Sequence, residues 1–261
     1  MAVPDFPRIT SRQHEIVKRF RLAARRRIDD VVLLDGDHLL TDAMDAGVAI
    51  DVVAASAAQR STAGRAKAAG ATVYEVADAV LDAISPVRTP SGIVALARWT
   101  PASLDRAFNV ADALVVGLCD VQDPGNAGSA IRSADALGAT AVLALDGTAH
   151  PAGWKALRGS MGSTFRLPVA VGSLADAIEA AGARKIQVIA TVAGDGVPAD
   201  QADLTRPTLL LLGSEGGGLD PAVVRRANHR VTIPMRPGVN SLNVAATSAL
   251  LLYEARRQRS A

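Results

Sequence analysis

Cysteine, aromatic residues and long apolar runs are scarce in this sequence, and these shortages narrow the class of protein. The single cysteine, Cys119, cannot form a disulfide within one chain, and its place in the apolar run 113–119 indicates a buried thiol rather than a nucleophile. The four histidines lie far apart and share no ligand spacing, so we expect no metal site. No apolar segment is long enough to cross a bilayer and no hydrophobic signal opens the chain, so we expect no membrane partner and a cytoplasmic protein.

The net charge is only +2, which does not by itself indicate a nucleic-acid-binding protein. Basic residues are nevertheless concentrated in the first thirty residues, with few acids between them. A cluster of this kind can contact nucleic-acid phosphates, although a solvated helix face explains the pattern equally well. The residues to which we assign such contacts are Arg12, Lys18, Arg25, Arg26 and Arg27.

The chain of 261 residues exceeds the common size of one domain, so two domains are expected. Segments typical of strands and helices alternate along it, which indicates an α/β fold. The first domain is predicted over residues 1–100. Its expected strands are 31–34, 48–54, 72–76 and 93–99, and its expected helices are 11–27 (capped by Ser11), 37–46, 57–69 and 77–84.

A proline and polar residues interrupt the alternation at 99–109, where we place the domain boundary, with a linker over 101–110 and the second domain over 111–261. The strand expected at 113–121 is apolar throughout, as are parallel strands buried on both faces. The second domain is therefore predicted to hold a mostly parallel sheet covered on both sides. Its other expected strands are 141–145, 164–169, 187–192, 208–212 and 230–233, and its expected helices are 127–137, 154–158, 174–181, one from 221, and a last helix that buries Leu242, Ala245, Ala246, Ala249 and Leu250.

Three stretches of the second domain combine turns with polar residues. The motifs are Asn126-x-Gly128-x-x-x-Arg132, then Gly213-x-Glu215-x-x-Gly218-Leu219, and finally Ile233-Pro-Met235 followed by Ser241-Leu-Asn243. Each alone has an ordinary explanation as a turn, a glycine loop or a helix cap. The glycine loop is not a dinucleotide-binding fingerprint, because it follows a late strand, and it is not a P-loop, because no lysine follows it.

Together, and in this order, the three motifs resemble the signatures of the SpoU (TrmH-like) family of RNA 2′-O-ribose methyltransferases, within the SPOUT superfamily. The resemblance implies S-adenosylmethionine as cofactor and a homodimer with active sites near its interface. It also implies a C-terminal α/β-knot domain, in which the last helix passes through the preceding loop. The first domain, through residues 33–40 and 89–97, is similar to the L30e-like substrate-binding domain that often precedes the catalytic one.

The resemblance places the cofactor on the motif segments, and the residues themselves are compatible with this. Gly213, Gly216, Gly217 and Gly218 allow close backbone approach and positive φ. The loop ends of an α/β sheet are where a nucleotide-like cofactor binds. The predicted cofactor-binding residues are Thr191, Leu212, Gly213, Gly218, Ile233, Met235, Leu242 and Ala245.

Methyl transfer to a ribose hydroxyl is an in-line displacement that depends on positioning and on removal of a proton. In the SpoU family the arginine that matches Arg132 is thought to help activate the hydroxyl. A guanidinium is a poor base, so we assign Arg132 to clamping an RNA phosphate and to transition-state electrostatics, and leave a base role open. The alternative is a surface ion pair with Asp135 or another neighbour. The remaining predicted catalytic residues orient the ribose hydroxyl and the loop. The full predicted catalytic set is Asn126, Arg132, Glu215, Ser241 and Asn243.

The RNA substrate is indicated only by the first domain. Residues 11–20 resemble the basic N-terminal helix of members that act on large-subunit ribosomal RNA, so 23S rRNA is the favoured substrate. In those members an Asn is usual in place of His14 and a Glu in place of Asp35. A tRNA 2′-O-methyltransferase and a non-catalytic RNA-binding or ribosome-assembly protein on the same fold remain alternatives.

Overall fold

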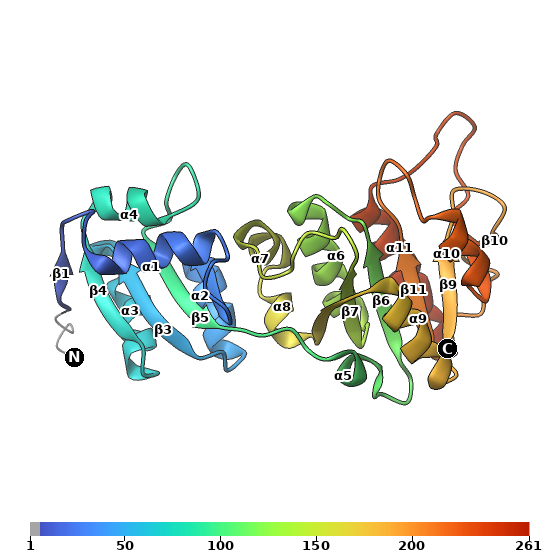
Figure 1. Ribbon diagram of the computed structural model, residues 1–261, viewed down its shortest axis with the longest axis horizontal. Coiled ribbons are helices and arrows are strands. Elements are labelled where there is room, and N and C mark those ends of the chain that lie inside the picture. Colours follow the sequence, from blue (N-terminus) through green and yellow to red (C-terminus); the bar gives the residue numbers. More distant parts are fainter. Residues whose placement is uncertain (1–5, 261) are drawn as a thin grey trace. The chain divides into compact units, whose positions relative to one another are not determined.

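The computed structural model describes residues 6–260 and divides into two compact units (Figure 1). The first unit holds residues 6–100 together with 152–165, and the second holds 101–151 and 166–260. The segment 152–165 thus follows two strands of the second unit in sequence but packs with the first.

The first unit is built on a five-stranded sheet with strand order β1-β4-β3-β5-β2. Strand β5 lies between β3 and β2 and runs antiparallel to both, whereas β3, β4 and β1 pair in parallel. Successive side chains point to opposite faces of a strand, so Leu33 and Leu34 enter separate buried clusters on the two faces. The strands are β1 (Arg8–Ile9), β2 (Val31–Asp35), β3 (Ile50–Ala55), β4 (Thr72–Val76) and β5 (Ile93–Arg98).

Helices cover both faces of this sheet. On one face lie α1 (Glu15–Ala24) and α4 (Asp78–Ile84), and on the other lie α2 (Asp37–Asp45) and α3 (Arg60–Ala68), which follows the 3-10 turn η1 (Ala57–Gln59). The helix α7 (Trp154–Ser160) adds the fully buried Leu157 to the apolar cluster that α2 and α3 form with the sheet. The prediction that Ser11 caps the first helix is wrong: His14 Nδ1 accepts the Ile16 amide at 3.3 Å, and α1 begins after it.

The second unit contains a seven-stranded sheet with strand order β10-β12-β9-β11-β6-β7-β8, in which every described strand pair is parallel. Its strands are β6 (Leu114–Cys119), β7 (Ala141–Leu145), β8 (Val169–Gly172), β9 (Gln187–Thr191), β10 (Val197–Pro198), β11 (Thr208–Leu212) and β12 (His229–Thr232). Cys119 is 7% exposed, and burial raises the pKa of its thiol to about 12, which confirms a structural thiol.

The predicted strand at 164–169 is wrong in its first half. Residues Ser163–Arg166 form the short helix α8, and β8 starts only at Val169. Thr164 is buried, and its hydroxyl donates at 2.8 Å to Oγ of Ser160, the last residue of α7. Local packing therefore outweighs the strand preference of a β-branched residue.

Helices also cover both faces of the second sheet. The helices α5 (Leu104–Phe108), α9 (Leu174–Ala183) and α10 (Pro221–Arg226) share one buried cluster with the strands. On the other face α6 (Pro124–Leu137) packs along α11 (Val244–Arg259). The helix α6 begins earlier than predicted, because Asp123 Oδ1 accepts the Asn126 amide at 2.8 Å and Pro124 occupies the first turn.

The apolar periodicity predicted for the last helix is correct, but its phase is wrong. Leu250, expected in the packed face, is 49% exposed, and Ala246 is exposed as well. The buried stripe is Val244, Ser248, Leu251, Leu252 and Ala255. Leu242 lies before the helix, whose first turn is capped by Asn243. None of the helices within residues 6–260 combines the length and apolarity needed to span a bilayer.

Candidate functional site

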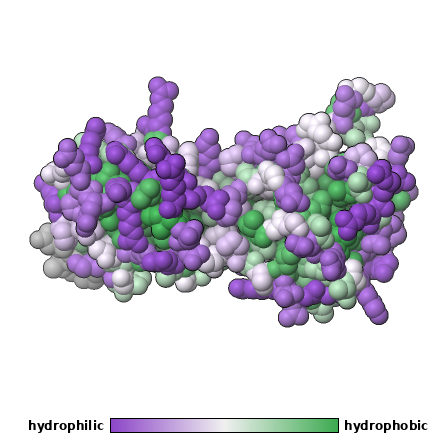
Figure 2. Space-filling view, viewed as in Figure 1, coloured by the Kyte–Doolittle hydropathy of each residue, from purple (hydrophilic) through white to green (hydrophobic). Residues whose placement is uncertain are grey.

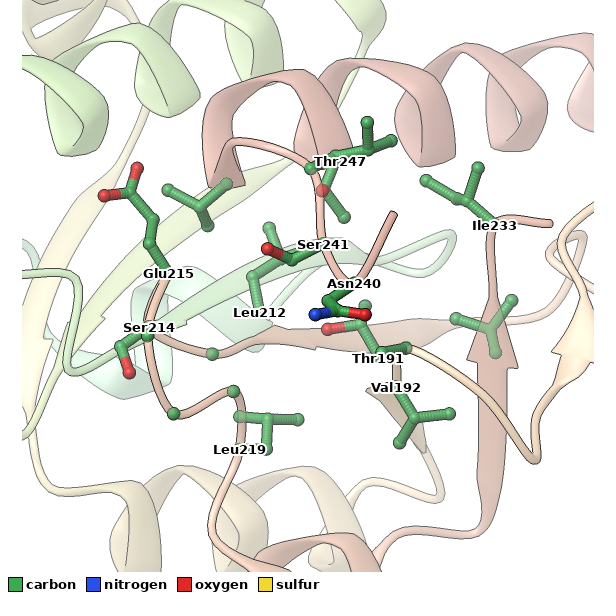
Figure 3. A pocket seen from close by; sticks show the side chains of 18 of the residues that line it. Thr191, Val192, Leu212, Ser214, Glu215, Leu219, Ile233, Asn240, Ser241 and Thr247 are labelled. Carbon is green, nitrogen blue, oxygen red and sulfur yellow. The ribbon is translucent and has the colours of Figure 1, made fainter. Parts of the chain in front are cut away.

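A pocket of about 380 Å³ opens at the carboxyl ends of β9, β11 and β12 (Figure 3). Three chain segments form its walls: the end of β9, the glycine loop 213–219, and residues 233–242 with the first turns of α11. The carboxyl edge of a parallel sheet is the usual place for a ligand, and the volume suits a small molecule.

Most of the predicted cofactor-binding residues meet here. Lining the pocket are Thr191, Leu212, Gly213, Gly218, Ile233, Met235 and Leu242, whereas Ala245 does not line it. The pocket also has walls that the sequence interpretation missed, among them Val192, Ser214, Leu219, Asn240, Val244 and Thr247. The spacing of Val244, Thr247 and Leu251 along α11 is the one signal that was available, because residues three and four apart share a helix face.

Two of the loop glycines are required by the backbone. A Cβ at Gly213 would collide with the backbone of Gly218 and Leu219. Gly218 itself has φ 66°, and its amide donates to the Ser214 carbonyl at 2.9 Å, which closes the loop. At Gly216 there is open space and an ordinary φ, so among the glycines of this loop only Gly218 uses the positive φ that glycine permits.

The pocket offers both apolar surface and open main-chain groups. Leu212, Leu219 and Ile233 surround it, as Figure 3 shows. The main-chain groups of Ile233 and Leu242 make no hydrogen bond with any residue between 6 and 260. A flat heterocycle held between the apolar side chains can therefore be read by backbone donors and acceptors at its edge.

One side chain from each motif joins in a closed hydrogen-bonded network beside the pocket. Asn126 Nδ2 donates to Glu215 Oε1. Asn243 Nδ2 donates to Asn126 Oδ1 and to the same Glu215 oxygen, each at 3.0 Å. Figure 3 shows the Glu215 carboxylate pointing away from the middle of the pocket. Its hydrogen bonds are with the side-chain amides of Asn126 and Asn243. We call Asn126, Glu215 and Asn243 the amide–carboxylate triangle.

Asn243 ties this triangle to the last helix. Its Oδ1 accepts the amides of Ala245 at 2.9 Å and Ala246 at 3.3 Å, which caps α11. The backbone of Asn126 is held by Asp123 at the start of α6. The triangle therefore joins the N-terminal ends of two packed helices to the glycine loop.

The two other predicted catalytic residues lie outside the triangle. Ser241 is exposed and lines the pocket beside Asn240 (Figure 3). Arg132 is exposed on α6, six residues and thus about 9 Å of helix rise beyond Asn126. Within residues 6–260 it has no hydrogen-bond or ion-pair partner. The alternative of a pair with Asp135 is not observed; Asp135 Oδ2 instead pairs with Arg166 at 2.9 Å.

The predicted RNA-contacting cluster remains open on the surface of the first unit. All five residues are exposed, and the Arg12 guanidinium donates to the Ala79 carbonyl at 2.8 Å. Arg26 adopts φ 52°, and partial burial lowers the pKa of its guanidinium. Across the described residues no three His, Cys, Asp or Glu side chains gather as metal ligands would.

Known proteins match both units. The SpoU rRNA Methylase family matches residues 113–253, and the MRM3-like substrate binding domain matches residues 16–95. The 23S rRNA (guanosine(2553)-2′-O)-methyltransferase RlmP of Bacillus subtilis is 30% identical over 239 residues, which cover 92% of this chain and 94% of the relative.

Solved structures with the same fold include an AdoMet-bound rRNA methyltransferase from Sinorhizobium meliloti, with a TM-score of 0.87 at 31% identity over 97% of this chain and 98% of that one. The SpoU methyltransferase AviRb from Streptomyces viridochromogenes, in complex with AdoMet, has a TM-score of 0.84 at 29% identity over 95% and 99% of the two chains. The predicted fold class and family resemblance are thereby confirmed. This chain belongs to the SpoU rRNA methylase family.

Proposed function

We propose that this protein transfers a methyl group from S-adenosylmethionine to a ribose 2′-hydroxyl of 23S ribosomal RNA. The observation that carries the proposal is the amide–carboxylate triangle, which joins the three family motifs beside the pocket. The 23S rRNA 2′-O-methyltransferase RlmP, a relative of this chain, and the AdoMet bound in similar structures support the reaction and the cofactor.

The pocket fits S-adenosylmethionine by its size, its apolar walls and its open backbone groups. Leu212, Leu219 and Ile233 would hold the faces of the adenine, and the main chain of Ile233 and Leu242 would bind its edge. Gly213 lets the loop close around the ligand. When bound, the cofactor supplies an electrophilic methyl group on a positively charged sulfur.

The surrounding polar residues position the RNA and the ribose hydroxyl. Arg132 has no partner among residues 6–260, and its guanidinium fork suits a phosphate oxygen pair. A guanidinium keeps its proton in proteins, so Arg132 acts by clamping and by stabilising charge in the transition state. Ser241 points into the pocket and orients the hydroxyl, while the triangle holds the loop and both helix ends in place.

A methylation assay tests the proposal directly. The purified protein is incubated with labelled S-adenosylmethionine and either ribosomal or transfer RNA, and 2′-O-methyl groups are mapped by nucleotide. We expect label at a ribose of 23S rRNA. Label in tRNA would overturn the substrate, and the absence of label in any RNA would favour a non-catalytic RNA-binding protein. Calorimetry should detect one S-adenosylmethionine site per chain and no binding of nicotinamide dinucleotides.

The first unit would bind the RNA through its basic cluster. Figure 2 shows hydrophilic side chains over the part of this unit where α1 lies in Figure 1. Replacing Arg25, Arg26 and Arg27 with Gln should weaken RNA binding and reduce its salt dependence, because fewer counterions are released. Arg98→Gln is a suitable control, since Arg98 is already paired with Asp51 at 3.0 Å. An unchanged affinity and salt slope in the triple variant would mean that the cluster does not contact phosphate.

We also propose that the protein is a homodimer and that α11 supplies part of the interface. Leu250 and Tyr253 are 49% and 62% exposed on one face of this helix, a large apolar surface for a soluble chain. Leu250→Asp combined with Tyr253→Asp should convert the dimer to a monomer in sedimentation. Val171→Asp, at an exposed residue of β8, is the matched control and should leave the dimer intact. A wild-type monomer would refute the proposal.

A further inference from the structure

The carboxylate nearest to Arg132 along α6 is held by an arginine from elsewhere in the chain. Arg166, the last residue of α8, donates from Nε at 3.0 Å and from Nη2 at 2.9 Å to Oδ2 of Asp135. The Asp135 side chain is 24% exposed. A carboxylate with this much burial needs a partner more than a fully solvated one does.

Arg132 is the residue of α6 whose spacing lets it compete with Arg166 for Asp135. Residues three apart on a helix are neighbours, so Arg132 and Asp135 are spaced to form an ion pair. The two share α6, yet Arg132 has no hydrogen-bond or ion-pair partner anywhere in residues 6–260 while Asp135 is engaged by Arg166.

We propose that Arg166 is a positioning residue that keeps Arg132 available to the RNA by occupying Asp135. This inference rests on the proposed function, because it concerns the phosphate clamp of that reaction. Arg166 also neutralises Asp135, so an approaching phosphate meets the positive charge of Arg132 without an uncompensated negative charge one turn away. Arg166 need not touch the RNA.

Removing Arg166 alone, and then Arg166 together with Asp135, tests whether Arg166 acts through Asp135. Arg166→Ala should lower kcat/KM for RNA about fivefold, the effect of one unit charge across a few ångströms of water. Adding Asp135→Ala to that variant should restore kcat/KM to within about twofold of the wild type, since Arg132 then has no competitor. Arg166→Lys should retain most of the activity, and Asp135→Ala alone should equal or exceed the wild type.

Two controls separate positioning from general damage. Arg184→Ala breaks an ion pair with Asp105 in the same unit, at 2.5 Å, and should leave kcat/KM unchanged. The affinity of each variant for S-adenosylmethionine should equal that of the wild type. Full activity of Arg166→Ala would overturn the inference, as would a double variant no better than the single one. A wild-type protein that methylates no RNA would instead overturn the proposed function.

Discussion

Asn243 caps α11 and completes the amide–carboxylate triangle with opposite ends of one side chain, and substitution can separate the two roles. The acceptor oxygen binds the first-turn amides of α11, while the amide nitrogen donates to Asn126 and Glu215 at 3.0 Å each. Serine preserves a capping oxygen but cannot supply two donors at the length of an asparagine side chain. Alanine removes both roles.

The expected magnitudes differ between stability and activity. Loss of the cap in Asn243→Ala should cost about 1 kcal/mol of unfolding free energy, which lowers the Tm of a unit of this size by about 2–4 °C. Asn243→Ser should remain within about 0.5 kcal/mol of the wild type, because water replaces the exposed hydrogen bonds. Both variants should lose about 100-fold in methyl transfer, the size expected when a positioned group shifts by about 1 Å.

Thermal unfolding, cofactor calorimetry and the methylation assay on the same preparations measure these effects. Ser173→Ala is the matched control: Ser173 caps α9 by accepting the Asp176 amide at 3.1 Å, away from the pocket. This control should lose similar stability but no activity. Wild-type transfer by Asn243→Ser would refute the role of the triangle, and equal destabilisation by Ser and Ala would refute the role of the cap.

Three further changes address other parts of the molecule. Arg132→Ala should abolish transfer while folding and cofactor affinity persist, and much weaker cofactor binding would instead place Arg132 in the cofactor site. Gly213→Ala should abolish cofactor binding by steric collision, whereas Gly216→Ala should retain it; equal affinities would show that the loop adapts. Burial raises the pKa of Asp35 above 3.8, so its contribution to stability falls as pH rises through the native pKa. Asp35→Asn should therefore gain stability relative to the wild type as pH rises above about 4 in denaturant titrations, and a constant difference would contradict this.

The sequence predicts secondary structure best where apolar strands are bounded by turn residues. The strands 72–76, 141–145 and 208–212 match residue for residue. The last two are short, buried, almost wholly apolar runs, and the first is rich in β-branched and aromatic residues, both of which are typical of strands. The phase of α11 and the start of β8 were missed, since both depend on which neighbours bury each residue. Exposed Leu250 illustrates this limit. The apolar periodicity predicts that one face of the helix is buried, but the neighbouring elements decide which face that is.

The site was predictable as a set of segments but not as a set of contacts. The three motifs indicated which loops approach the pocket. Glu215 and Asn126 are separated by 89 residues, and Asn243 and Asn126 by 117, so no spacing in the sequence predicts their mutual hydrogen bonds. Thr247 and Val244 were missed because the walls supplied by α11 depend on where that helix begins.

Deletion of residues 1–100 is expected to expose an apolar side chain of the remaining chain, which the sequence did not indicate. Leu157 of α7 is fully buried in the apolar cluster of the first unit, so deleting residues 1–100 exposes it. The cluster between α5, α9 and the second sheet has its own residues, so a chain of residues 101–261 should fold and bind cofactor but self-associate. Leu157→Gln in the shortened chain should reduce this association, seen by light scattering, with unchanged cofactor affinity. If the shortened chain is as soluble as the full one and the substitution has no effect, residues 152–165 must find another apolar surface on the second unit.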